Sequence, residues 1–125
     1  MWLDSEFIQL IYGGDADDTI ATYAGNDIAY GGGGNDIITG TLGDDEFYGG
    51  SGHDHLWGGE GDNVLDGGKG NDELYDIYGG DTLIGGPGQD AFNVIWDYGE
   101  FETVGLTTKV EFQAGLTPPY GAPSI

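Results

Sequence analysis

Residues 31–39 read Gly-Gly-Gly-Gly-Asn-Asp-Ile-Ile-Thr, and the same nine-position pattern continues without interruption on both sides. Stepping by nine residues from Gly31 defines nine contiguous units that occupy residues 13–93. Six turn-like positions followed by three residues centred on an apolar one are too few for a helix, and they fit a turn plus a short strand. Repetition at a fixed period therefore predicts a solenoid.

Three columns of the repeat have a physical interpretation. The fourth position is Gly in eight units and Ala16 in the first, which suits a turn that needs positive φ. The eighth position is apolar in every unit, and we expect one inward side chain per unit. These residues are Ile20, Ala29, Ile38, Phe47, Leu56, Leu65, Leu74, Leu83 and Phe92. The sixth position is Asp in eight units and Asn in one: Asp18, Asp27, Asp36, Asp45, Asp54, Asn63, Asp72, Asp81 and Asp90.

These columns resemble the calcium-binding nonapeptide of the repeats-in-toxin (RTX) family, Gly-Gly-x-Gly-x-Asp-x-(apolar)-x, over the whole of residues 13–93. The resemblance implies an all-β fold, a parallel β-roll: a right-handed β-solenoid of nine tandem repeats in which two units form one 18-residue coil. It also implies that Ca²⁺ binds between the turns of successive coils. In the family, each ion takes main-chain carbonyls from two stacked turns and the sixth-position Asp of each, which suits a hard cation.

Because successive units lie on opposite edges of such a roll, alternate turns are expected to stack in two rows. Row one has five turns that all begin Gly-Gly and end in Asp, so about four Ca²⁺ ions are expected in its gaps. Its predicted ligands are Asp18, Asp36, Asp54, Asp72 and Asp90, with the turn residues Gly31, Gly33, Gly49, Ser51, Gly67, Lys69 and Gly85. Row two has four less regular turns, with up to three ions and the predicted ligands Asp27, Asp45, Asn63 and Asp81. Asn63 borders two of its gaps and is expected to weaken both.

The composition also favours cations as partners. The 125 residues include 23 acidic and 2 basic ones, a net charge of −21, and no Cys. This charge excludes nucleic acid and anionic membrane surfaces as direct partners. An extracellular domain of this size without disulfides needs another stabilising link, for which a metal is the usual substitute. We expect the chain to be disordered without calcium and to fold on binding it.

The segments that flank the repeat are expected to close the ends of the solenoid. Residues 1–12 are interpreted as an N-terminal capping strand with Ile11 inward. Residues 94–125 are interpreted as a C-terminal cap and tail, with strands at about 100–104 and 108–113. Phe101 still falls on the inward position of the nine-residue register, and the sequence leaves open whether these strands continue the roll or fold back as a hairpin.

The N-terminus lacks the basic region of a secretory signal peptide. The RTX resemblance implies secretion by a type I system that reads an uncleaved C-terminal signal. The tail of this chain, residues 118–125, does not resemble such a signal, which suits an excised fragment of a larger secreted protein.

The sequence supports a transition-metal site or a catalytic site less well than it supports calcium binding. The sequence His53-Asp54-His55 could suggest a transition-metal or catalytic cluster, but both His residues fall on variable positions of the repeat. The signatures Gly-x-Ser-x-Gly and His-Glu-x-x-His are absent, so no enzyme activity is predicted.

Outward aromatic residues at the ninth position offer one alternative function. Tyr30 and Tyr48 are two units apart, as are Trp57 and Tyr75, so each pair should be adjacent on one sheet face. Such ladders are usually cross-strand packing. The leading hypothesis is a calcium-binding module that supports the secretion, folding and stability of a larger secreted protein; the alternative is a carbohydrate-binding module of a polysaccharide-modifying enzyme.

Overall fold

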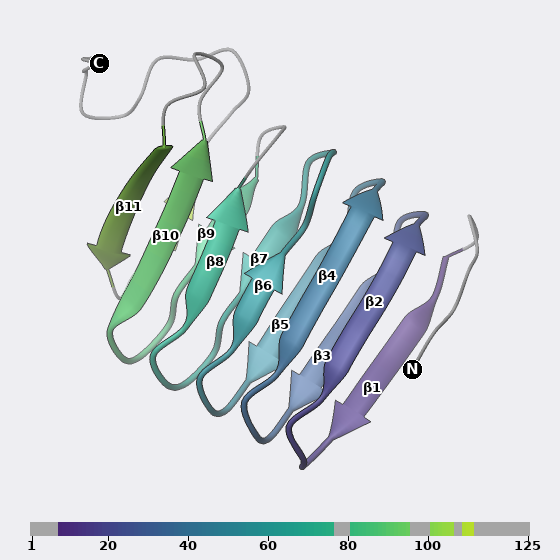
Figure 1. The fold of residues 1–125 in the computed structure, drawn as a ribbon, viewed down its shortest axis with the longest axis horizontal. Helices are drawn as coiled ribbons and strands as arrows, with labels where there is room; N and C mark the ends of the chain where they lie inside the picture. Colours follow the sequence, from purple (N-terminus) through teal and green to yellow (C-terminus); the bar gives the residue numbers. More distant parts are fainter. Residues whose placement is uncertain (1–7, 77–80, 96–100, 107–108, 112–125) are drawn as a thin grey trace.

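The computed structural model describes residues 8–76, 81–95, 101–106 and 109–111, and these ranges contain twelve strands in two six-stranded sheets and no helix. From β1 to β10 the chain alternates between the sheets, which lie face to face (Figure 1). In spatial order, the first sheet is β1 (Leu10–Gly14), β3 (Ile28–Gly32), β5 (Glu46–Gly50), β7 (Val64–Asp66), β9 (Thr82–Ile84) and β12 (Lys109–Glu111). The second is β2 (Thr19–Ala24), β4 (Ile37–Leu42), β6 (His55–Trp57), β8 (Glu73–Asp76), β10 (Asp90–Ile95) and β11 (Phe101–Leu106).

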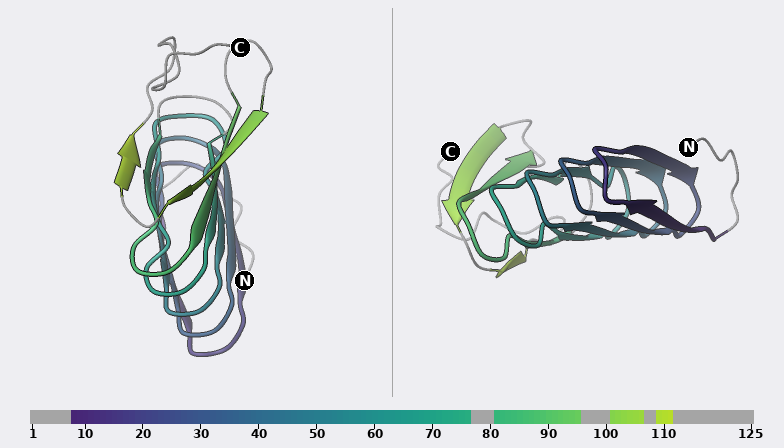
Figure 2. Two further views of the ribbon diagram at one scale, coloured as in Figure 1. Left: turned by 90° about the vertical axis from the view of Figure 1, so that its left-hand side faces the viewer. Right: turned by 90° about the horizontal axis from the view of Figure 1, so that it is seen from below.

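The strands from β1 to β10 pair in parallel at an offset of 18 residues, which shifts only at Tyr23 of β2. Ala29 of β3 pairs with Phe47 of β5, and Leu56 of β6 pairs with Leu74 of β8. One coil is therefore two nonapeptides, and the coils stack as flattened loops along one axis (Figure 2). The all-β parallel β-roll expected from the sequence is confirmed.

The core is a single file of apolar side chains between the two sheets. Its members recur every nine residues and are at most 4% exposed: Ile11, Ile20, Ala29, Ile38, Phe47, Leu56, Leu65, Leu74, Leu83 and Phe92. All the eighth-position residues are included, and so is Ile11 of β1. Because this core is only one side chain wide, most of the remaining order must come from the backbone ladders and the turns.

The C-terminal strands answer the question that the sequence left open. β11 folds back antiparallel on β10 in the second sheet, and β12 pairs antiparallel with β9 in the first sheet. Neither continues the parallel roll. Phe101 pairs antiparallel with Ile95, so it does not belong to the parallel nine-residue register. Both strands overlap the expected 100–104 and 108–113, of which residues 100, 108, 112 and 113 lie outside the described residues.

The N-terminal end differs from the C-terminal end. β1 is the edge strand of the first sheet and β2 that of the second, and both pair in parallel with the next coil. Residues 1–7 of the expected capping segment lie outside the described residues, so the segment's capping role stays a prediction. Ile8, Leu10 and Tyr12 are exposed at this end of the roll.

Candidate metal centre

The sixth-position side chains are buried within the turns that connect the sheets. Those of eight turns are at most 3% exposed: Asp27, Asp36, Asp45, Asp54, Asn63, Asp72, Asp81 and Asp90. Asp18, in the first turn of the roll, is partly exposed. Buried carboxylates stacked one coil apart are costly unless each is hydrogen-bonded or neutralised by a cation.

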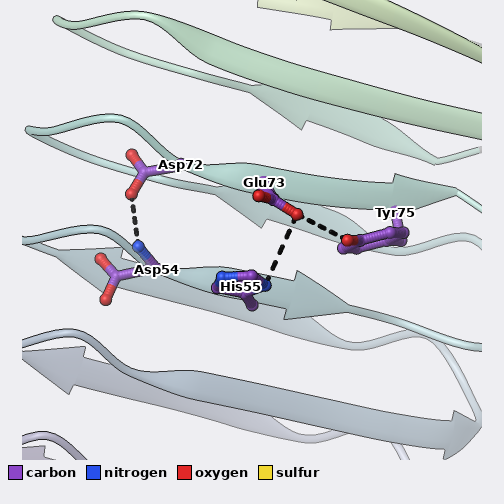
Figure 3. Close-up of polar contacts among 5 residues, drawn as sticks. All are labelled: Asp54, His55, Asp72, Glu73 and Tyr75. Atoms are coloured by element: carbon purple, nitrogen blue, oxygen red, sulfur yellow. Dashed lines mark hydrogen bonds and ion pairs between the residues drawn. The ribbon is translucent and has the colours of Figure 1, made fainter.

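In every turn after the first, one side-chain oxygen of the sixth-position residue accepts a backbone N–H group. The backbone N–H of Asp36 donates to Oδ1 of Asp54 over 2.8 Å, and the N–H of Asp54 donates to Oδ1 of Asp72 over the same distance (Figure 3). The same contact recurs between other sixth-position residues 18 apart in both rows. Each of these accepting side chains therefore holds the turn of the preceding coil.

The second oxygen of these carboxylates has no such partner. Oδ2 is buried and without a hydrogen bond in Asp18, Asp27, Asp36, Asp45, Asp54, Asp72 and Asp90. A buried polar atom of this kind requires an explanation, because native proteins satisfy nearly all such groups. The geometry around the first residue of each turn supplies one.

Oxygen atoms from two successive coils converge beside the first glycine of the turns that begin at Gly13, Gly31, Gly40 and Gly49. They surround the point that a Cβ would occupy, which we call the open point because glycine leaves it without a side chain. A Cβ placed on Gly49 would lie 2.5 Å from Oδ2 of Asp54 and 2.7 Å from the carbonyl oxygen of Gly67 in the next coil. At Gly31 the matching distances are 2.5 Å to Oδ2 of Asp36 and 2.7 Å to the carbonyl oxygen of Gly49. Carboxylate and carbonyl oxygens are the ligands that Ca²⁺ prefers. The residues present therefore fit a calcium ion between the coils.

The pKa values of the buried carboxylates point to the same partner. Burial raises the pKa of Asp45 and Asp72 to about 7 and that of Asp54 to about 6. It also raises the pKa of Asp36 and Asp90. For Asp72, the backbone N–H of Asp54 opposes the rise in pKa, whereas the negative charge of Asp54 adds to it. A divalent cation at Oδ2 would act in the opposite direction, because it stabilises the ionised form.

The first-position residues predicted as ligands lie at these open points. Gly31, Gly49 and Gly67 each direct a carbonyl oxygen towards the first residue of the preceding turn in row one. Gly85 lies against Oδ2 of Asp90 in the same way that the other first-position glycines lie against their Asp. Their role as calcium ligands stays a prediction.

The predicted third-position residues take part in the backbone ladder. Gly33, Ser51 and Lys69 donate their N–H groups to second-position carbonyl oxygens of the preceding coil over 2.8, 2.9 and 2.9 Å. The carbonyl oxygen of Lys69 also accepts the N–H of Gly52 over 3.1 Å. A carbonyl oxygen has two lone pairs, so these bonds leave room for an ion as a second partner.

Row two departs from this geometry in its first turn. Thr22 stands where row one has Gly, and it is fully buried, so its side chain occupies the space that glycine leaves open. Tyr23 has a φ of 66°, a left-handed conformation that is uncommon for residues other than Gly, and the β2–β4 register shifts at this point. Gly40 in the next turn keeps the open point and faces Oδ2 of Asp45.

The fifth position forms a second ladder that the sequence interpretation missed. The side chain of Asn35 accepts the N–H of His53 over 2.9 Å, and Nδ1 of His53 accepts the N–H of Asn71 over 3.1 Å. Asn26 and Asp44 make the equivalent contact in row two over 2.8 Å. A fifth-position side chain accepts an N–H group of the following coil, whereas a sixth-position side chain accepts one of the preceding coil. The signal was present, because the fifth position is Asp, Asn, His or Gln in eight of the nine units.

Gln9 was also missed, although it lies 18 residues before Asp27. Its N–H donates to Oδ1 of Asp27 over 2.9 Å, as a sixth-position residue would. Its Nε2 donates to the carbonyl oxygen of Thr22 over 3.2 Å, and its Oε1 is buried without a partner. The spacing of 18 could have identified it, but its unit lacks the Gly-rich turn.

The His-Asp-His sequence does not form a cluster. His53 belongs to the fifth-position ladder, whereas His55 lies on the sheet face with Nδ1 3.6 Å from Oε1 of Glu73 (Figure 3). The hydroxyl of Tyr75 donates to the same Glu73 oxygen over 2.6 Å. Among the residues that the structure describes, no three His, Cys, Asp or Glu side chains converge as metal ligands. An ion in the turns therefore depends on carbonyl oxygens.

The predicted aromatic ladders are confirmed. Tyr30 stacks on Tyr48 with ring centroids 4.9 Å apart, and Trp57 stacks on Tyr75 with centroids 5.2 Å apart. Tyr12 extends the first ladder with a centroid distance of 5.0 Å to Tyr30. Since the rings cover one another along the axis of the roll, mainly their edges face outward.

These features define a class, the parallel β-solenoids whose turns carry stacked, buried carboxylates. The profile of the family described as "RTX calcium-binding nonapeptide repeat (4 copies)" matches residues 12–47 and 39–74, which together span half of the chain. The chain belongs to this family, whose repeats bind Ca²⁺ and whose members are typically secreted. No curated protein and no solved structure matches the chain significantly. Within the described ranges, no helix is long and apolar enough to cross a bilayer.

Proposed function

We propose that this chain is a structural module that folds when it binds extracellular Ca²⁺ and thereby supports the secretion, folding and stability of a larger secreted protein. It stays unfolded where calcium is scarce, as in the cytosol. It folds after export, when ions fill the gaps between its coils. The module itself carries out no catalysis.

The observation that carries this proposal is the stacking of buried, unpartnered Oδ2 atoms opposite carbonyl oxygens of the next coil. Coils stack at strand spacing, about 4.8 Å. Two ionised carboxylates at that distance repel each other by roughly 3 to 4 kcal/mol at an effective dielectric constant near 20. With a core one side chain wide, the chain has little apolar burial to offset this repulsion, so a cation is the expected stabiliser.

A calcium titration followed by far-UV circular dichroism tests the proposal. We expect a coil-to-β transition on adding Ca²⁺, and little response to Mg²⁺, whose preference for near-octahedral geometry and retained waters fits carbonyl-rich turns poorly. A chain that is fully folded in chelator would contradict the proposal.

The alternative carbohydrate-binding function is less well supported. Sugars usually bind against an exposed aromatic face, whereas Tyr30 and Tyr48 lie 13° from parallel and cover each other. Trp57 is 45% exposed, but one of its faces is stacked on Tyr75. A glycan-array screen of the calcium-loaded chain would separate the two functions.

A further inference from the structure

Asn63 has the same orientation as the sixth-position carboxylates, but it brings a donor to the place where they bring an acceptor. Its Oδ1 accepts the N–H of Asp45 over 2.8 Å, which fixes Nδ2 on the other side of the carboxamide. A Cβ on Gly58 would lie 2.5 Å from Nδ2, as a Cβ on Gly49 would lie 2.5 Å from Oδ2 of Asp54. The amide nitrogen therefore occupies the place of the unpartnered carboxylate oxygen.

Unlike that oxygen, the amide nitrogen has partners within its own turn. Nδ2 of Asn63 donates to the carbonyl oxygens of Gly59 and Gly61 over 3.4 and 3.5 Å. In a turn that ends in Asp, a carboxylate oxygen lies at the place of Nδ2, and it cannot donate to these carbonyl oxygens. A calcium ion can join several such oxygen acceptors. In residues 58–63, two N–H groups join them without an ion.

We propose that the Asn63 carboxamide takes the place of a calcium ion, so that residues 58–63 form a calcium-independent turn within a calcium-binding roll. This inference rests on the proposed function, because it presupposes that the turns ending in Asp bind calcium. It also changes the expectation that Asn63 weakens both of the gaps that it borders.

The gap before Asn63 keeps its ligands. A Cβ on Gly40 would lie 2.5 Å from Oδ2 of Asp45 and 2.9 Å from the carbonyl oxygen of Gly58, so these oxygens still converge. Oδ1 of Asn63 provides the same contact to the preceding coil that an Asp would provide. The amide therefore removes one ion, on the side of Nδ2, and it also removes one buried negative charge from the calcium-free chain.

The substitution Asn63→Asp tests this inference, because it exchanges the NH₂ group for an oxygen at nearly constant volume. The number of bound Ca²⁺ ions is measured by native mass spectrometry of the full chain, and the calcium midpoint of folding by circular dichroism. We expect the variant to bind one Ca²⁺ ion more than the wild-type chain. The matched control is Asn71→Asp, which adds the same charge at an exposed position and keeps the oxygen that accepts the N–H of Gln89. Its ion count should equal that of the wild type.

The outcomes separate the two proposals. A wild-type chain that binds no calcium would overturn the proposed function and this inference together. A wild-type chain that binds calcium, with an Asn63→Asp variant of unchanged ion count and a lower calcium midpoint, would overturn only this inference, since Asn63 would then be an ordinary calcium ligand. An unchanged count with an equal or higher midpoint would also overturn it, because restoring the carboxylate oxygen would then not restore an ion.

A measurement on the wild-type chain keeps the test independent of how well the variant folds. In the calcium-loaded protein, the two side-chain N–H protons of Asn63 should exchange with solvent more slowly than those of the exposed Asn71, as observed by NMR. Equal exchange rates for the two side chains would overturn the inference.

Discussion

The open point beside a first-position glycine predicts that adding one methyl group there, as in a Gly→Ala substitution, impairs calcium-induced folding. In Gly49→Ala, the added Cβ would lie 2.5 Å from Oδ2 of Asp54 and 2.7 Å from the carbonyl oxygen of Gly67. The φ of Gly49 is not in the left-handed region, so alanine suits the backbone and the steric effect stands alone. The carbonyl oxygen is a main-chain atom, and the N–H of Gly67 donates to the carbonyl oxygen of Ile84, so this oxygen cannot move freely. The methyl group would also displace an ion from the space between the two oxygens.

The magnitude follows from these contacts. Overpacking of a well-packed site typically costs about 1 to 3 kcal/mol, which is roughly 5- to 150-fold in the folding equilibrium. We therefore expect a higher calcium midpoint for Gly49→Ala and one bound ion fewer. Circular dichroism during a calcium titration measures the first quantity, and native mass spectrometry measures the second.

The control is Gly33→Ala in the same row. A Cβ on Gly33 would have its nearest contacts with Asp15 at 3.6 Å, an ordinary van der Waals distance, and its φ also lies outside the left-handed region. This variant should keep the wild-type ion count and midpoint within about 0.5 kcal/mol. Equal effects of the two substitutions would refute the reasoning, because the open point would then have no special role.

Three further predictions concern the rows, the C-terminal end and pH. Asp54→Ala should raise the calcium midpoint more than Asp81→Ala, because Asp54 lies between two regular turns of row one; equal shifts in titrations of the two variants would contradict the asymmetry between rows. Removal of residues 94–125 should abolish or greatly weaken calcium-induced folding, since β11 and β12 cover the last parallel strands; a truncated chain with the wild-type midpoint would argue against this role. Burial raises the pKa of Asp45 and Asp72 to about 7, so the calcium-free fold binds protons more strongly than the unfolded chain. Its stability should be greatest below about pH 4 and should fall as the pH rises through 7, and an unchanged β signal in chelator between pH 8 and pH 4 would contradict this expectation.

The sequence alone determined the parts of the fold that repeat. The apolar residue at the eighth position of each nine-residue unit specifies one inward side chain per unit, and all of these residues are buried. The Gly-rich turns and sixth-position Asp residues, through their resemblance to the RTX nonapeptide, indicated coils of 18 residues, and the strand register has this offset. These features were predictable because every coil places the same residues in the same environment, so the period itself carries the three-dimensional information.

Only the tertiary structure decided which atom of each side chain faces which coil. Oδ1 of Asp54 points to the preceding coil and Oδ2 to its own turn, because the N–H that selects this orientation belongs to Asp36, 18 residues away. A contact with a residue 18 positions away also orients the NH₂ group of Asn63 towards its own turn. A contact over the same separation joins Gln9 to Asp27 in row two. The C-terminal strands lack the period, so the sequence could not show that β11 and β12 pair antiparallel with different sheets. Where the repeat ends, contacts between distant segments determine the structure, and no local pattern records them.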